Sequence, residues 1–141
     1  MTGWRTVTTS LATTLATVTL VATACSADGD DVCADSDELS GVGFVFVDDP
    51  KSGERVSSGF QVSGCSSTFE ANLNWRLRDR DGKPLATGVA QGGSIEPSSF
   101  EFTVDYKVAA RQIGELEVYE PTVTTEGFPP SKDIVPLLLE P

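Results

Sequence analysis

The chain has 141 residues, of which 39% are apolar and 8% are aromatic, enough for one domain with a hydrophobic core. Its formal net charge of −11 gives it an acidic surface, which excludes nucleic acid as a partner and opposes electrostatic docking on anionic lipid. Because the chain has no histidine, it lacks the most common general base and metal ligand, so we expect no cofactor and no bound metal.

Residues 1–24 combine one basic residue, Arg5, with an uncharged run rich in Thr, Ala, Val and Leu, which is typical of a secretory signal peptide. The run ends in small residues directly before Cys25 and resembles the lipobox of bacterial lipoproteins. The resemblance implies that the peptide is cut before Cys25 and that this cysteine carries diacylglycerol and palmitate-type acyl chains. A signal cut elsewhere or an uncleaved anchor helix is the alternative, but the run is shorter than a span of about 20 apolar residues. We therefore expect a protein held by Cys25 on the extracytoplasmic face of the cell membrane.

The lipidated Cys25 and the acidic, small residues that follow it, through residue 42, predict a largely disordered tether. The carboxylates of this stretch lack the spacing of a calcium loop, so a solvated charge run is the preferred interpretation. They are Asp28, Asp30, Asp31, Asp35, Asp37 and Glu38.

Once Cys25 is lipidated, Cys33 and Cys65 remain, and an even pair in an oxidising compartment predicts one disulfide. The alternative is a reactive thiol, which would have no histidine to activate it. A disulfide would fasten the end of the tether to the domain.

The segment 69–77 shows the clearest alternation of the chain. Phe69 and Trp75 share one face with smaller apolar residues, and we expect this face to form the centre of the core. Alternation and turn residues predict further strands at 43–47, 56–64, 84–91, 100–106, 114–120 and 134–139. By the parity of segment 56–64, Cys65 points away from the core, where a cysteine of the tether could reach it.

Turn chemistry separates these strands. Asp81-Gly82 within residues 79–83 predicts a hairpin, and Pro136 predicts an edge or a bulge in the last strand. Seven or eight short strands without a helical period predict an all-β fold: an immunoglobulin-like antiparallel β-sandwich over residues 43–141, with a small barrel as the alternative.

Five motifs, together with Phe100 between the third and the fourth, carry a family resemblance through their order and spacing. They are residues 49–56, 62–71, 79–85, 114–120 and 134–137. Together they resemble the Gmad-type immunoglobulin-like domain, the second of the two germination-associated Gmad domains of bacterial envelope proteins, over nearly all of residues 44–139. The resemblance implies an extracytoplasmic module that acts in binding or assembly and has no catalytic residues. The chain departs from the family in Cys65, in the Phe128-Pro129-Pro130 loop and in standing alone behind a lipobox. We therefore expect a surface lipoprotein rather than a role in germination.

Three functions remain open from the sequence. In a binding module, Tyr119 on an outward strand position and Phe128 in a proline-rich loop are candidate contacts for an envelope protein or a wall polysaccharide. The alternatives are a tyrosine-corner-like hydrogen bond or cross-strand packing for Tyr119, and a packing role within its own loop for Phe128. A purely structural spacer is the second function. The third is a hydrolase of wall polymers with paired carboxylates, although three of its five candidates occupy outward, solvated positions. These candidates are Glu70, Asp79, Asp81, Glu115 and Glu117.

Overall fold

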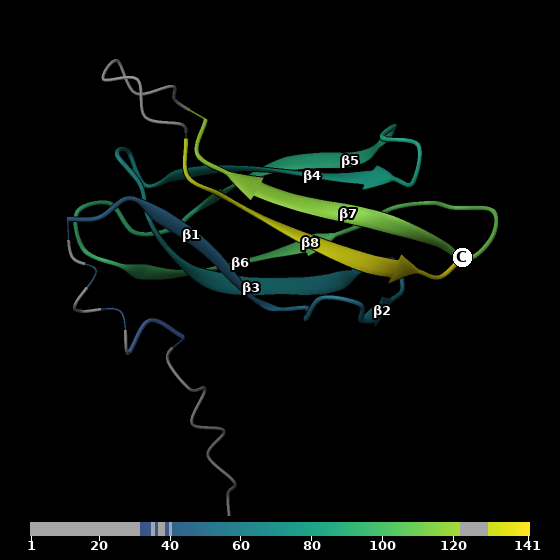
Figure 1. Ribbon diagram of the computed structural model, residues 1–141, viewed down its shortest axis with the longest axis horizontal. Helices are drawn as coiled ribbons and strands as arrows, with labels where there is room; N and C mark the ends of the chain where they lie inside the picture. The colour runs from purple at the N-terminus through teal and green to yellow at the C-terminus, as the bar shows by residue number, and fades with distance from the viewer. Residues whose placement is uncertain (1–31, 35, 37–38, 40, 122–129) are drawn as a thin grey trace, which may run out of the picture.

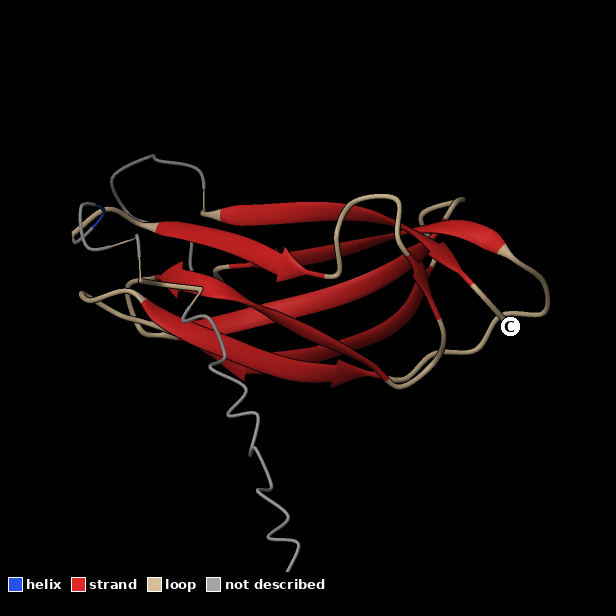
Figure 2. Ribbon diagram, turned by 90° about the horizontal axis from the view of Figure 1, so that it is seen from below, coloured by secondary structure: helices blue, strands red, loops and turns tan. Residues whose placement is uncertain are grey.

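The computed structural model describes residues 32–34, 36, 39, 41–121 and 130–141, and these form two packed β-sheets (Figures 1 and 2). The three-stranded sheet has the order β1-β3-β6 and the five-stranded sheet the order β2-β8-β7-β4-β5. The strands are β1 (Phe44–Asp49), β2 (Arg55–Val56), β3 (Phe60–Ser67), β4 (Asn72–Asp79), β5 (Pro84–Gln91), β6 (Ser98–Val104), β7 (Gln112–Tyr119) and β8 (Lys132–Leu139). The predicted all-β immunoglobulin-like sandwich is confirmed, with one short parallel pair, β2 with β8, among antiparallel neighbours.

The core lies between the sheets and is filled by alternate side chains, as the period of two requires. Trp75 of β4 is 8% exposed and stacks on Phe102 of β6, with ring centroids 5.0 Å apart, so one aromatic pair joins the two sheets. Gly88 of the neighbouring strand β5 makes room for the indole, because a Cβ there would lie 2.4 Å from Trp75 Cζ2. The prediction that Trp75 is a core residue is confirmed.

Phe69 does not share the core with Trp75, and this part of the prediction is wrong. Its side chain is 77% exposed, and β4 begins only at Asn72. Residues 68–71 form the turn between β3 and β4, in which Ala71 has a φ of 58° and its N–H donates to the carbonyl of Thr68. Because this turn interrupts the extended backbone, the parity of Trp75 does not carry back to Phe69.

The segment predicted as one strand at 56–64 is two strands in different sheets. Gly59, with a φ of 87°, lies in the turn between β2 and β3, and its positive φ favours glycine. Across this turn, the backbone N–H of Tyr106 donates to the Ser58 hydroxyl. The Tyr106 hydroxyl lies 2.6 Å from the Val56 carbonyl oxygen and 2.8 Å from that of Glu140, so it ties β2 to the end of β8. Burial raises the pKa of this hydroxyl.

The two turn predictions are confirmed by the backbone. In the hairpin of residues 79–83, the Asp79 carboxylate accepts the N–H groups of Asp81 and Lys83, and Gly82 has a φ of 80°. Pro136 pairs with Glu115 of β7 on one side, while β2 pairs only with Leu138 and Leu139 farther along β8. The Pro136 carbonyl accepts the N–H of Gly53, so its side away from β7 faces a loop. The proline therefore occupies an edge-like position, where a missing N–H breaks no ladder.

Candidate functional site

The outer face of the five-stranded sheet carries the most varied chemistry of the described residues. The alternation that sends leucines and Trp75 inward sends charged, aromatic and β-branched side chains outward. On strands β4, β7 and β8 these outward residues, to which we add the exposed Pro136, are Arg76, Arg78, Ile113, Glu115, Glu117, Tyr119, Lys132 and Ile134. We call this set the outer face.

Glu117 lies at the centre of the outer face and is buried beneath cations. Its carboxylate oxygens lie 2.5 Å from Arg76 Nε, 3.2 Å from Arg78 Nη2 and 3.7 Å from Lys132 Nζ. The strand register places Arg76 directly opposite Glu117, which leaves the Glu117 side chain only 7% exposed. The expectation of a solvated Glu117 is therefore wrong, because three long side chains from β4 and β8 fold over it.

These neighbours hold the pKa of Glu117 below its ordinary value of 4.5, chiefly through the hydrogen bond from Arg76. A carboxyl whose pKa is lower in the folded state stabilises the fold above its unfolded pKa, and this stabilisation is lost as the pH falls through the folded value. The same hydrogen bond raises the pKa of Arg76, which stays charged throughout.

We expect Glu117→Gln to lower the free energy of unfolding at neutral pH by about 1–3 kcal/mol, because a charge-assisted hydrogen bond and two ion pairs are lost. The difference from the native protein should be constant above the ordinary pKa of 4.5 and should shrink as the pH falls below it, through the lower pKa of the folded state. Urea denaturation between about pH 7 and about pH 3 measures it. Glu115→Gln, a change two residues along β7 at an exposed position, is the matched control and should show little difference. A constant difference at all pH values would contradict the assignment.

Tyr119 is half-buried on the outer face, with the Arg76 guanidinium carbon 5.0 Å from the centre of its ring. This cation–π contact is the cross-strand packing that was the alternative to partner recognition. The other alternative for Tyr119 was a tyrosine-corner-like hydrogen bond. In this structure Tyr106 makes such bonds instead, because its hydroxyl lies within hydrogen-bond distance of the Val56 and Glu140 carbonyl oxygens. The other candidate contact, Phe128, lies outside the described residues.

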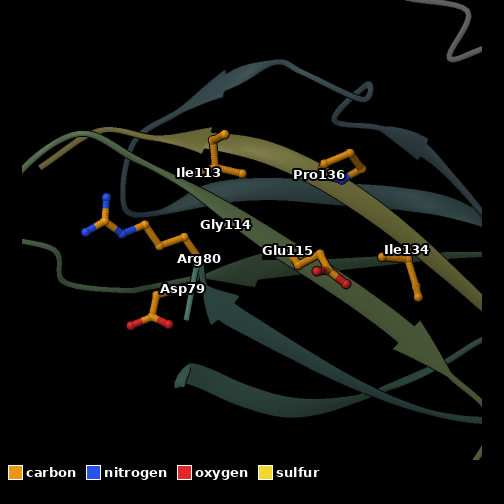
Figure 3. A pocket seen from close by; sticks show the side chains of 7 residues that line it. All are labelled: Asp79, Arg80, Ile113, Gly114, Glu115, Ile134 and Pro136. Carbon is orange, nitrogen blue, oxygen red and sulfur yellow. The ribbon is translucent and has the colours of Figure 1, made fainter. Parts of the chain in front are cut away.

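A shallow hollow of about 490 Å³ opens at one end of the outer face (Figure 3). Ile113, Glu115, Ile134 and Pro136 rise from β7 and β8, and Asp79 and Arg80 close the hollow at the end of β4. Ile113 is 62% exposed and Ile134 41% exposed, so the lining of the hollow includes apolar side chains that are open to solvent. Such a surface can hold a flat, partly apolar group between charged side chains.

The five carboxylates considered for hydrolysis do not assemble into a pair across a cleft. Glu70 lies in the turn after β3, and Asp81 lies in the hairpin after β4. Asp79 and Glu115 both line the hollow, but the Asp79 carboxylate is engaged by its own hairpin. Glu117 is neutralised by the cations described above. Among the residues that the structure describes, no group of three or more cysteine, aspartate or glutamate side chains is arranged to hold a metal ion.

Cys33 and Cys65 form a disulfide, as predicted. Cys65 projects from the outer side of β3, away from the core, and the two cysteines are 8% and 1% exposed. The end of the predicted tether is therefore not a free spacer. Around Cys33 it forms turns in which Ser36 donates to the Cys33 carbonyl and Leu39 donates to the Ser36 carbonyl. Cys25 lies outside the described residues.

The family model for the immunoglobulin-like domain of bacterial spore germination, Gmad2, matches residues 44–125. This chain belongs to the Gmad2 family. The resemblance inferred from the order of its motifs is confirmed. No curated protein sequence matches the chain. Among solved structures, CopC from Methylosinus trichosporium OB3b is similar over 69% of this chain and 94% of its own, with a TM-score of 0.41 and 15% sequence identity.

Within this Gmad2 domain, sequence reasoning missed the exposed apolar residues of the outer face. The parity that placed Glu115 and Glu117 outward also places Ile113 outward, one step before the predicted strand begins. Ile134 likewise alternates with the buried Val135. Extending the alternation by one residue before 114 would have found Ile113, and applying it within the strand predicted at 134–139 would have found Ile134.

None of the residues that the structure describes forms a helix long and apolar enough to cross a membrane.

Proposed function

We propose that this Gmad2 domain is a binding or assembly module of the cell envelope and that it is held at the extracytoplasmic face of the membrane by a lipid on Cys25. In this proposal the outer face recognises an envelope protein or a wall polysaccharide and performs no catalysis. The single observation that carries the recognition role is the apolar part of the hollow's lining, where Ile113 and Ile134 remain exposed among charged side chains.

The outer face favours recognition over a mere spacer role. A spacer needs only a polar surface, whereas exposed isoleucines rimmed by charges are typical of an interaction site. Elsewhere on the outer face, the hydrogen bond to Glu117 orients Arg76 before a partner arrives, which lowers the entropy that binding must overcome. Family membership supports a non-catalytic module, and the engaged carboxylates give no support to a hydrolase.

The recognition role is tested by placing a photo-crosslinking amino acid at Ile113 in cells. We expect one specific adduct, because this side chain is exposed within the hollow. A second probe at Phe128 tests the loop contact expected from the sequence. Gln61, which is exposed on the other sheet, is the matched control position. Adducts that are the same at Ile113 and Gln61, or absent from both Ile113 and Phe128, would argue for the spacer.

The anchor is tested separately with Cys25→Ala. Without the thiol no diacylglycerol can be attached, so we expect the variant to leave the membrane fraction and to lose its detergent-phase partitioning. Cell fractionation and mass spectrometry of the mature N-terminus measure both effects. Unchanged membrane partitioning of Cys25→Ala would contradict the lipoprotein proposal. The crosslinking result at Ile113 does not depend on whether Cys25 is lipidated, so the two tests can fail separately.

A further inference from the structure

One end of the sandwich gathers exposed apolar side chains from three separate loops. It is the end where β3, β5 and β7 finish and where β1, β4, β6 and β8 begin, at the left in Figure 1. Phe69 is 77% exposed in the β3–β4 turn and Ile95 is 74% exposed in the β5–β6 loop. Leu39 and Val42, 42% and 53% exposed, lie in the segment that leads into β1. We call these four residues the loop-end patch.

Hydrogen bonds show that the three loops are neighbours. The Ser94 hydroxyl donates to the Phe69 carbonyl at 3.2 Å, which joins the β5–β6 loop to the β3–β4 turn. The Gly41 N–H donates to the Ile95 carbonyl at 3.4 Å, which joins the entry segment to the same loop. The apolar tips therefore belong to one surface rather than to scattered positions, and scattered single residues would need no explanation.

The chain reaches the domain at this same end. The disulfide fixes Cys33 to Cys65, two residues before the end of β3. Cys25 precedes Cys33 by eight residues, a stretch that can span at most about 28 Å when fully extended. This step rests on the proposed lipid anchor. A lipid on Cys25 would keep the loop-end patch close to the bilayer and raise its effective concentration there.

We infer that the loop-end patch rests on the bilayer, with Phe69 and Ile95 inserted into the interfacial region of the membrane that holds the lipid of Cys25. Burial of apolar side chains provides the attraction. Electrostatic attraction to lipid does not contribute, because the described residues of these three loops include no Lys or Arg, and Glu70 is exposed beside Phe69. The contact therefore depends on the anchor and should be weaker on anionic lipid than on neutral lipid. In this orientation Ile113, near the start of β7, lies toward the end of the sandwich that is away from the membrane.

Fluorescence quenching tests this orientation. Cleavage before Cys25 removes Trp4 and leaves Trp75, which is buried, as the only native tryptophan. The lipidated protein carrying Phe69→Trp is reconstituted in phosphatidylcholine vesicles with brominated acyl chains. Its additional emission should fall about twofold relative to unbrominated vesicles, since interfacial residues lie within a few Å of the acyl chains. Ile113→Trp, at an exposed position near the other end of the sandwich, is the matched control and should not be quenched.

Two results would overturn the inference. Equal quenching at both positions would mean that the domain lies flat, and no quenching at Phe69→Trp would mean that the patch does not touch lipid. A protein crosslinked specifically at position 69 in cells would assign the patch to a protein partner instead. Mass spectrometry for diacylglycerol on Cys25 separates failure of the anchor from failure of the patch. If the native lipid is absent, coupling the Cys25 thiol to a maleimide phospholipid supplies the anchor. The same quenching measurement then shows whether the loop-end patch touches lipid.

Discussion

Replacing Trp75 with alanine is expected to lower the free energy of unfolding by about 3–5 kcal/mol, the usual cost of removing a buried aromatic side chain. The indole is 8% exposed and stacks on Phe102 across the two sheets, and Gly88 leaves the space that it fills. Its removal opens a cavity that cannot close, because the backbone of β5 is held by pairing with β4. A domain of this size has about 5–15 kcal/mol of stability in total, so the variant should be close to unfolding.

Urea denaturation followed by far-ultraviolet circular dichroism measures this effect without relying on the deleted fluorophore. Ile113→Ala removes a large apolar side chain that is 62% exposed and should change stability by less than about 0.5 kcal/mol. If Trp75→Ala lowered the free energy of unfolding no more than Ile113→Ala does, the sandwich core would not be built around the indole.

Removing the disulfide by replacing both Cys33 and Cys65 with serine should lower the free energy of unfolding by roughly 3–4 kcal/mol. The bridge joins residues 32 positions apart, and a closed loop of this length restricts the unfolded chain by about that amount in the chain-entropy model. The serines at the two buried positions would add a cost for polar groups placed without partners. Chemical denaturation of the double variant and of the native protein with and without reductant measures the effect.

Thiol titration provides the control for the disulfide. Native mature protein, unfolded without reductant, should show no thiol from Cys33 or Cys65, and reductant should release two. Reduced native protein should lose the stability that the cross-link contributes, and it should be at least as stable as the double variant, because its buried thiols carry no added serine hydroxyls. Two reactive thiols before reduction, or equal stability of the native protein and the double variant, would contradict the structural role of the bridge.

Several local features could be predicted because each depends on residues that are close in sequence. The strand at 84–91 has the same bounds in the structure, and the Asp-Gly hairpin depends only on the side chain of Asp79 and the φ of Gly82. The outward position of Cys65 followed from parity along β3. The ordered motifs identified the family before any contact was known. In each case alternation or turn chemistry acts over a few residues.

The predictions that were wrong concern Phe69, the segment 56–64 and Glu117, and they share a different cause. Phe69 fits the alternation of β4, but the turn that begins at Thr68 ends this alternation at Ala71. Val56 and Phe60 share a parity and yet belong to different sheets. The environment of Glu117 depends on Arg76 and on Lys132, which reach it from neighbouring strands. The alternation of residues along one strand does not indicate which strand pairs with it.

The sequence by itself determined that alternate side chains build strands and that Trp75 belongs to the core, because periodicity and turn residues are local properties. It also predicted the pair of Cys33 with Cys65, because these two cysteines remain when Cys25 is set aside for the expected lipid. Only the tertiary structure decided that Glu117 is covered by three cations, that Ile113 and Ile134 share an open hollow, and that Phe69 and Ile95 lie on one end with the entry of the chain. These arrangements depend on which strands pair and which loops meet. Such contacts join residues tens of positions apart, and the free energy of the whole fold selects them.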